Sequence, residues 1–384
     1  MIKKIIIFLT YILLFFNSNL LSNENNKELK IGLLAPFSGE YKDLGQSLMF
    51  SIQLALDEIN DSNIKIIPRD SGSGNIEKLN NSIQEIKDSG ARVIIGPVDS
   101  ENFDVIEKYK GLIFISLSNK NPEIRENIIS IGISLESQIN AIEKFIIKKN
   151  KKKTIIIFPK NQYTNFIEKK IKNIKLKNHK IFRYSADPKI LTGEIQKLTN
   201  YSQRKNNLES RKKILEDKDD YASKEELKKL EQMYTLGEVD FDSIIIIDFG
   251  SSLKSALTSL IFSDVSDEKV IFTTVNQWFD KSIFYENSVK NLYYPSVDLK
   301  NFSNYNKKFT DTFNTQPNDV TILAYDALGL IYYIWSKNNG ITSINDFLIK
   351  EKFAGKIGTF TFKDKKVFQE LKIYKTAQGK FKKD

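Results

Sequence analysis

Residues 30–36 read KIGLLAP, a short apolar run that an amphipathic stretch from about Leu44 to Asn60 follows. In that stretch apolar residues recur three or four positions apart, which is the spacing of one helix face. Similar runs, each followed by another helical stretch, lie at 65–68 (KIIP), 92–96 (RVIIG) and 112–116 (LIFIS). Short strands that alternate with amphipathic helices predict a parallel sheet with helices on its faces. This part of the chain therefore predicts one doubly wound α/β lobe.

A second series of the same kind follows a helix predicted from Ser134 to Lys149. Its strands are predicted at Thr154–Phe158, Lys180–Tyr184, Ser243–Ile247 and Lys269–Thr273. Later elements are a strand at Leu292–Pro295, helices near Phe302–Phe313 and Val320–Ser336, and a closing pair of strands around Gly358–Phe362 and Leu371–Tyr374. The repeated alternation predicts a second doubly wound lobe.

We therefore expect an α/β fold of two parallel-sheet lobes joined by crossing strands, with a hinge and an inter-lobe cleft. Lobe 1 is expected to comprise residues 29–133 and 293–342, and lobe 2 residues 134–292 and 343–384. Within lobe 2, residues 201–236 hold nine Lys or Arg and eight Asp or Glu among helix formers. That balance predicts a solvated helical hairpin, either a recognition element or a passive insertion.

The first 22 residues have the layout of a secretory signal peptide. Lys3 and Lys4 precede an apolar run from Ile5 to Phe16, and small or polar residues lead to Ser22. The run is shorter than the roughly 20 apolar residues that a spanning helix needs. We therefore expect cleavage after Ser22 and a periplasmic protein. The chain has no cysteine, so we expect no disulfide and no lipid anchor.

The formal net charge of +10 raises the question of a nucleic-acid or membrane-surface partner. Only six of the 58 basic residues are arginine, the side chain best suited to bidentate phosphate recognition. The lysines are interleaved with Asp and Glu along most of the chain. The composition therefore favours a solvated lysine-rich surface and no nucleic-acid partner.

The sequence offers no recognisable catalytic arrangement. The single histidine, His179, has no Gly-x-Ser-x-Gly nucleophile elbow to serve. The turn at 70–74 (DSGSG) lacks the Gly-Lys-Ser/Thr of a phosphate-binding loop, and no calcium-loop spacing occurs. We therefore expect a protein that is not an enzyme and that holds no metal and no cofactor.

In a doubly wound lobe, ligands gather where the strands end, beside the N-termini of helices. Ser100 and Ser118 follow two predicted strands of lobe 1, and Tyr163, Asp248 and Phe249 follow two strands of lobe 2. Hydroxyl groups on one lobe that face an aromatic ring and a carboxylate on the other suit a small polar ligand. The alternative is that Ser and Asp at these places only cap helices.

The order and spacing of four segments resemble those of leucine/isoleucine/valine-type proteins, which are type I periplasmic binding proteins. The segments are Ile31–Gly39, Ile94–Pro97, Ile115–Glu123 and Asn161–Tyr163. A narrower resemblance is to the penicillin-binding protein activators, relatives of the LpoA C-terminal domain. It rests on the charged insertion and on Leu236–Ile244, Asn276–Asp280 and Leu323–Ala327. The lipid-bearing cysteine of the gammaproteobacterial activators is missing.

The resemblance implies a set of ligand-binding residues. Ser100 corresponds to the carboxylate-binding serine of the amino-acid site, and Ser118 to a position that contributes backbone. Tyr163 corresponds to the aromatic residue of lobe 2, and Phe249 falls near a second aromatic position.

Two positions depart from the amino-acid site of the family. Lys120 stands where the family has a small hydroxyl, and Asn276 stands where an acid meets the ammonium group. A buried ammonium group without its charge partner costs about 3 kcal/mol or more. Asp248 replaces that acid only if the geometry allows.

The resemblance implies a non-catalytic protein that closes on a small amino-acid-like or peptidoglycan-derived ligand, in the manner of amino-acid transport proteins. Its partners are then a small molecule and a membrane transporter. The alternative is a penicillin-binding protein activator that regulates a peptidoglycan synthase by protein contact. The departures at Lys120 and Asn276 predict a preference for anions over zwitterions.

Overall fold

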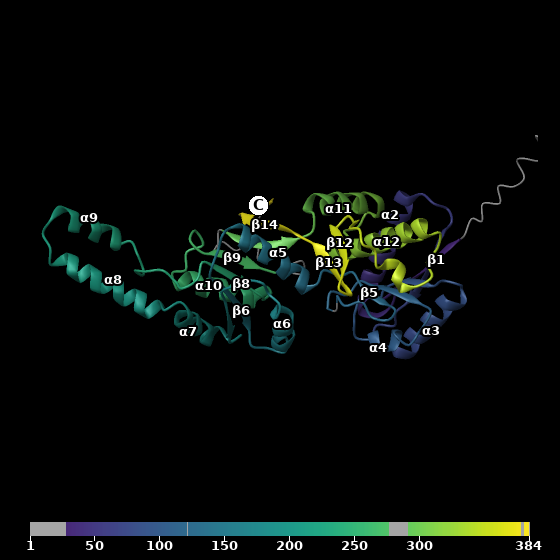
Figure 1. Cartoon of the computed structure of the whole chain (residues 1–384), viewed down its shortest axis with the longest axis horizontal. Coiled ribbons are helices and arrows are strands. Elements are labelled where there is room, and N and C mark those ends of the chain that lie inside the picture. Colours follow the sequence, from purple (N-terminus) through teal and green to yellow (C-terminus); the bar gives the residue numbers. More distant parts are fainter. Residues whose placement is uncertain (1–27, 121, 276–290, 378–379, 384) are drawn as a thin grey trace, which may run out of the picture.

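The computed structural model describes residues 28–120, 122–275, 291–377 and 380–383. The predicted signal peptide and Asn276 lie outside these residues. Two lobes lie side by side along the long axis of the molecule (Figure 1). No helix in the described part of the chain is long and apolar enough to cross a membrane.

Lobe 1 is built on a parallel five-stranded sheet with the order β2-β1-β3-β4-β5. The strands are β1 (Leu29–Ala35), β2 (Ile64–Asp70), β3 (Val93–Ile95), β4 (Ile113–Ser116) and β5 (Ile128–Ser130). The helices are α2 (Lys42–Ile59), α3 (Ile76–Asp88), α4 (Phe103–Ile106), α11 (Leu299–Phe313) and α12 (Ile322–Asn338). Short 3₁₀ helices lie at Gly39–Tyr41, Asp319–Thr321 and Ile344–Phe347.

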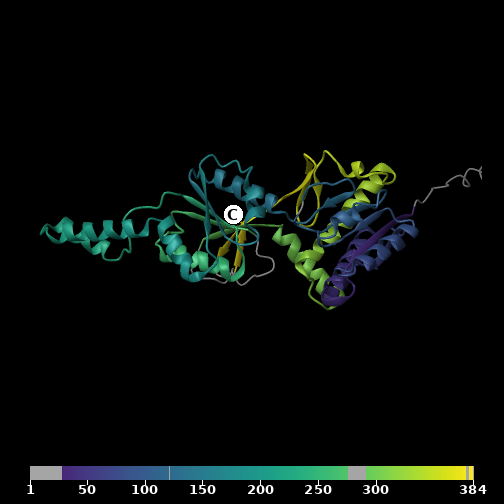
Figure 2. The same ribbon diagram turned by 90° about the horizontal axis from the view of Figure 1, so that it is seen from below.

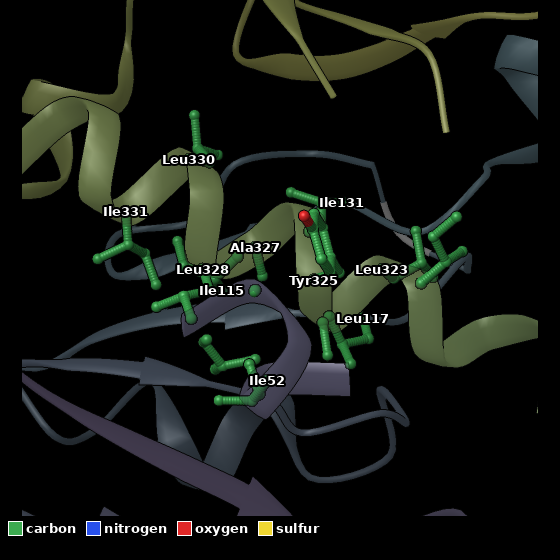
Figure 3. Close-up of a cluster of buried hydrophobic side chains, with 14 of the residues drawn as sticks. Ile52, Ile115, Leu117, Ile131, Leu323, Tyr325, Ala327, Leu328, Leu330 and Ile331 are labelled. Atoms are coloured by element: carbon green, nitrogen blue, oxygen red, sulfur yellow. The ribbon is translucent and has the colours of Figure 1, made fainter. Parts of the chain in front are cut away.

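Alternate strand residues of lobe 1 enter two separate cores. Ile95 and Ile115 pack with α2, α11 and α12, whereas Ile94 and Phe114 pack with α3 and α4. This follows from the two-residue period of a strand in a sheet that is covered on both faces. Figure 3 shows Leu328 of α12 in the first of these cores, near Ile115.

The predicted helix from Asp99 to Tyr109 is shorter in the structure, since only Phe103–Ile106 forms α-helix. The Asp99 carboxylate accepts a hydrogen bond from the Glu101 amide at 3.1 Å. That local bond turns the chain before the helix begins.

Lobe 2 has a seven-stranded sheet with the order β15-β14-β10-β9-β8-β6-β7. The strands are β6 (Thr154–Pro159), β7 (His179–Tyr184), β8 (Ser243–Ile246), β9 (Ile271–Thr274), β10 (Leu292–Ser296), β14 (Lys372–Ala377) and β15 (Lys380–Lys383). The strands from β7 to β10 are parallel, and β14 and β15 are antiparallel. The helices are α5 (Leu135–Lys148), α6 (Thr164–Ile171), α7 (Pro188–Leu198) and α10 (Gly250–Phe262).

The expected lobe boundaries need correction near the end of the chain. Residues 343–370 were expected in lobe 2, but Phe347, Phe360 and Val367 belong to the core of lobe 1. Phe360 and Val367 are part of a separate antiparallel sheet, and Phe347 precedes it in the chain. The strands of this sheet are β11 (Phe353–Ala354), β12 (Thr359–Lys363) and β13 (Lys366–Glu370). The predicted closing strands are therefore in different sheets, since β12 pairs with β13 and β14 pairs with β10. All of β10 also lies in the lobe 2 sheet.

Three short segments connect the lobes: 131–134, 297–298 and Leu371. The Gln369 side-chain amide donates to the carbonyls of Ile131 and Gly132 at 2.7 and 2.8 Å. The Leu299 amide donates to the Tyr374 hydroxyl at 3.0 Å. Because these bonds link the connections to one another, the three segments form one joint where hinge motion would occur.

The predicted helical insertion consists of α8 (Tyr201–Glu216) and α9 (Tyr221–Leu230). Both views show this hairpin projecting from the end of lobe 2 that lies away from lobe 1 (Figures 1 and 2). Leu208, Leu215 and Leu230 form a small core of their own. The hairpin is therefore a self-contained arm.

The base of the hairpin is fixed by Arg204, a buried residue of α8. Its guanidinium group donates to the carbonyls of Thr199, Ser263 and Asp264 and to the Thr235 hydroxyl. Thr199 and Ser263 are the C-caps of α7 and α10, where carbonyl groups lack helical partners. A cation at these helix ends also complements their partial negative charge.

Candidate functional site

A cavity of about 510 Å³ lies between the two lobes. Leu117 follows β4 in lobe 1, and Pro159 and Ile247 stand at the ends of β6 and β8 in lobe 2. Ile133, in the first connection between the lobes, also lines it. The cavity is therefore at the carboxyl ends of the parallel strands, where doubly wound folds hold ligands.

Most of the cavity wall is apolar. Its apolar residues are Val98, Leu117, Ile133, Leu135, Pro159, Phe166, Ile167, Ile247, Phe249, Val320 and Leu323. The other lining residues are Asn119, Lys120, Gln138, Asn161, Tyr163 and Asp248. An apolar wall with a few polar groups is the usual composition of a small-molecule site.

Four of the predicted site residues line this one cavity. Lys120 comes from lobe 1, and Tyr163, Asp248 and Phe249 come from lobe 2. The Tyr163 and Phe249 side chains are each 55% exposed. Aromatic rings that stand open on one wall are available to cover a ligand when the lobes approach each other.

Ser118 lies behind the cavity wall. Its amide donates to the Ser116 hydroxyl at 3.1 Å, and its own hydroxyl accepts from the Lys120 amide at 3.3 Å. The Ser116 hydroxyl in turn donates to the Pro97 carbonyl. Ser118 therefore positions the backbone of Lys120, and its side chain is not part of the lining.

The remaining two predicted residues are not brought to the cavity by the described structure. Ser100 is half-buried and absent from the lining, and its carbonyl accepts a hydrogen bond from the Phe103 amide. This bond is part of a backbone turn, and the N-cap of α4 is Asn102, so Ser100 does not take the helix-cap position either. Asn276 lies outside the described residues.

Asp248 is buried and already holds several donors of lobe 2. Its carboxylate accepts from the Tyr184 hydroxyl and the Ser252 hydroxyl at 2.5 Å each, and from the Phe249 amide at 2.8 Å. Burial raises the pKa of Asp248, while these hydrogen bonds oppose the shift. Through these hydrogen bonds, Asp248 stabilises the part of the lobe 2 cavity wall that contains Phe249.

The first turn of α5 was not predicted to line the site. Leu135 and Gln138 enter the cavity from this turn, which Ser134 caps by accepting from the Ser137 amide. In the sequence, this location was indicated by the predicted helix that begins directly after the chain leaves lobe 1.

Asn161 also lines the cavity and folds the start of α6. The side-chain oxygen of Asn161 accepts from the Tyr163 backbone amide at 2.8 Å, and the backbone amide of Asn161 donates to the Thr164 hydroxyl at 3.0 Å. The aromatic residue therefore sits on a turn that is preformed by local hydrogen bonds.

Across the described residues, no group of three potential ligand side chains could hold a metal ion.

Comparison with known proteins agrees with this geometry. A model of the family described as "Periplasmic binding protein" matches residues 28–174. The C-domain of LpoA from Haemophilus influenzae, described as a regulator of PBP1A, is 13% identical with a TM-score of 0.62. The match covers 92% of this chain and 99% of that domain. Against full-length LpoA, the chain covers 58% of the length.

Transport binding proteins share the same architecture. A putative branched-chain amino acid ABC transporter protein from Rhodospirillum rubrum is 10% identical with a TM-score of 0.69, covering 93% of this chain and 99% of the other. LivJ from Streptococcus pneumoniae, in complex with isoleucine, is 18% identical with a TM-score of 0.54, covering 93% and 98%. No curated protein matches the sequence. The chain has the two-lobed fold of type I periplasmic binding proteins, as the resemblance in its sequence implied.

Proposed function

We propose that the chain is a non-catalytic periplasmic protein whose lobes close on a small ligand with an apolar body and an anionic group. The observation that carries this proposal is the cavity of about 510 Å³ with walls from both lobes. Its volume lies within the range of roughly 300 to 1,000 Å³ that is typical of small-molecule sites. Export by the N-terminal signal and delivery to a membrane transporter belong to the same proposal.

The charges on the cavity wall support an anionic ligand. Lys120 is the cationic residue among the described lining side chains, and it is exposed. The carboxylate of Asp248 is engaged by three donors of its own lobe. The Asp248 carboxylate is therefore poorly available to pair with an ammonium group in the site. The positive charge of Lys120 would also repel that group, and both effects oppose the binding of a zwitterion.

Leucine and 4-methylpentanoate test this directly, because they share the side chain and carboxylate but only leucine has the ammonium group. In calorimetric titrations we expect 4-methylpentanoate to bind more tightly. Lys120→Ala should weaken it by about 1.5 to 3 kcal/mol, the value of a charged hydrogen bond.

Lys160→Ala is the matched control for this titration. Lys160 is a neighbouring lysine that pairs with Glu194 and does not line the cavity. Its replacement should leave the affinity unchanged. Tight, saturable binding of leucine to the wild type would overturn the proposed charge preference.

A second candidate function is regulation of a peptidoglycan synthase by protein contact. It is supported by the likeness to the LpoA C-domain, over 92% of this chain, and by the projecting hairpin. Tyr221 and Tyr234, at the tip and base of the hairpin region, are 80% and 76% exposed. Exposed tyrosines are frequent anchors in protein interfaces.

The two functions predict different effects of the hairpin. A regulator should lose stimulation of a purified synthase when Tyr221 and Tyr234 are both changed to serine. A ligand carrier should keep its affinity for 4-methylpentanoate in the same variant, since neither tyrosine lines the cavity.

A further inference from the structure

The positive charge of the protein is concentrated in one segment. From Lys144 to Ala186 the chain has 13 lysines and one arginine, and Glu168 is the only acidic residue. The whole chain has 58 basic and 48 acidic residues, so the rest holds 44 basic against 47 acidic residues and is slightly negative. The interleaving of charges that holds elsewhere therefore fails here.

The fold gathers these lysines at the amino-terminal edge of the lobe 2 sheet. β6 and β7 are parallel with Thr154 opposite His179, and the Thr154 amide donates to the Asn178 carbonyl at 3.0 Å. The loops that precede the two strands consequently lie side by side. The buried Glu143 of α5 accepts from the Lys175 amide at 2.5 Å, which ties the second loop to the end of α5.

Seven exposed lysines on these three elements form what we call the amino-edge patch. They are Lys144, Lys148, Lys149, Lys152, Lys172, Lys175 and Lys177. The acidic groups at this edge are already engaged: Asp240 pairs with Lys153 and Lys180 at 2.7 and 3.0 Å, Asp242 accepts from the Lys152 and Lys153 amides at 2.8 and 3.0 Å, and the buried Glu143 accepts from the Lys175 amide. Like charges held this close generate a positive field unless an anionic surface compensates them.

We propose that the amino-edge patch binds the surface of an anionic phospholipid bilayer. All seven residues are lysines, which are compact point charges suited to a diffuse negative surface, not to bidentate recognition of one phosphate. Ile147 is 54% exposed and lies one turn after Lys144 on the same face of α5. An apolar side chain among lysines can enter the headgroup region while their charges stay at the surface.

The position of the patch agrees with this role. The ligand cavity is at the carboxyl ends of β6 and β8, and the patch is at the amino ends of β6 and β7. Binding through the patch would therefore leave the mouth of the cleft turned away from the bilayer. The inference is independent of the ligand that the cleft takes.

The test is co-sedimentation of the exported protein with phosphatidylcholine vesicles that contain phosphatidylglycerol. The variant combines four changes in the patch: Lys148→Gln, Lys152→Gln, Lys172→Gln and Lys177→Gln. None of these four side chains has a hydrogen bond or ion pair within the described structure, so the fold should tolerate their replacement. A control with the same change in charge combines four exposed lysines of lobe 1: Lys87→Gln, Lys108→Gln, Lys110→Gln and Lys307→Gln.

The patch variant should partition at least about tenfold more weakly than the wild type, because each of the four lysines contributes up to about fivefold near an anionic surface. The control should partition within about twofold of the wild type, and high salt should abolish the difference. Ile147→Ser should weaken binding several-fold without any change in charge. Equal binding to pure phosphatidylcholine vesicles, or equal losses in patch variant and control, would overturn the proposal. Binding to isolated peptidoglycan sacculi but not to the vesicles would overturn the assignment to lipid.

Discussion

The replacement Asp326→Asn is a sharp test of how lobe 1 is held together. Asp326 lies on α12 and is fully enclosed. One carboxylate oxygen accepts from the Lys356 amide at 2.7 Å and the other from the Ile357 amide at 3.0 Å. These bonds fasten the turn between β11 and β12 to the main helix of the lobe. An asparagine can accept only one of them.

Burial raises the pKa of Asp326 to about 7 from its ordinary 3.8, because the backbone hydrogen bonds offset only part of the cost of desolvating the charge. A raised folded-state pKa contributes stability that is complete below the unfolded pKa and is lost as the pH rises through the folded pKa. Between about pH 5.5 and pH 8 this loss is about 2 kcal/mol for a single group. Asparagine is neutral at every pH, so the variant lacks this pH dependence.

The free energy of unfolding should be measured by urea titration at both pH values, with fluorescence as the signal, since Trp335 packs against the same core. We define the gap as the free energy of unfolding of the wild type minus that of the variant, and we expect it to be about 2 kcal/mol larger at the lower pH. Other titrating groups cancel in this comparison. A gap that does not change with pH would refute the raised pKa. A gap larger at the higher pH would show that the backbone hydrogen bonds outweigh desolvation.

Three further predictions concern the hairpin and the N-terminus. Arg204→Met should destabilise lobe 2 by about 3 kcal/mol in urea unfolding because it strands buried carbonyl acceptors, whereas Arg211→Met, which removes an exposed pair with Glu226, should cost less than about 1 kcal/mol. Replacing residues 206–233 with a short Gly-Ser linker should keep cooperative thermal unfolding, since the arm has its own core; loss of cooperativity would show that the arm belongs to the lobe. N-terminal sequencing of the periplasmic form should begin just after Ser22, and Met1 in the membrane fraction would contradict export by cleavage.

The central strands β3, β4, β6 and β8 were predictable because each is buried on both faces, whereas the short β5 and the lysine-rich β15 were not predicted. Ile94 and Ile95 enter different cores, so neither position tolerates a polar residue, and the resulting run stands out in the sequence. The hairpin was predictable for the opposite reason, since its charges alternate in sign along helix-forming residues.

The placement of residues 343–370 could not be predicted in the same way. Phe347 and Phe360 are apolar enough to join either lobe, and the choice depends on long-range packing. The hairpin of β12 and β13 turns at Asp364 and Lys365, which have φ angles of 51° and 54°. Left-handed angles at both turn positions usually call for Asn or Gly, so this pair gave a weak turn signal.

The candidate site was predictable in part. Lys120, Tyr163, Asp248 and Phe249 come directly after strands, and the fold brings the ends of parallel strands to one edge. Gln138 was missed because it comes from the first turn of a helix that lines the cleft only once the first inter-lobe connection has placed it.

The central claim, that the lobes enclose a small ligand, is tested most directly by native mass spectrometry of the protein purified from the periplasm. We expect the wild type to carry an acidic small molecule that is released on denaturation. A variant with Val98→Trp, at a partly buried position of the apolar wall, fills the cavity and should fold and be recovered without that mass. Recovery of the wild type as bare protein, or an adduct that the filled cavity retains in full, would contradict the account.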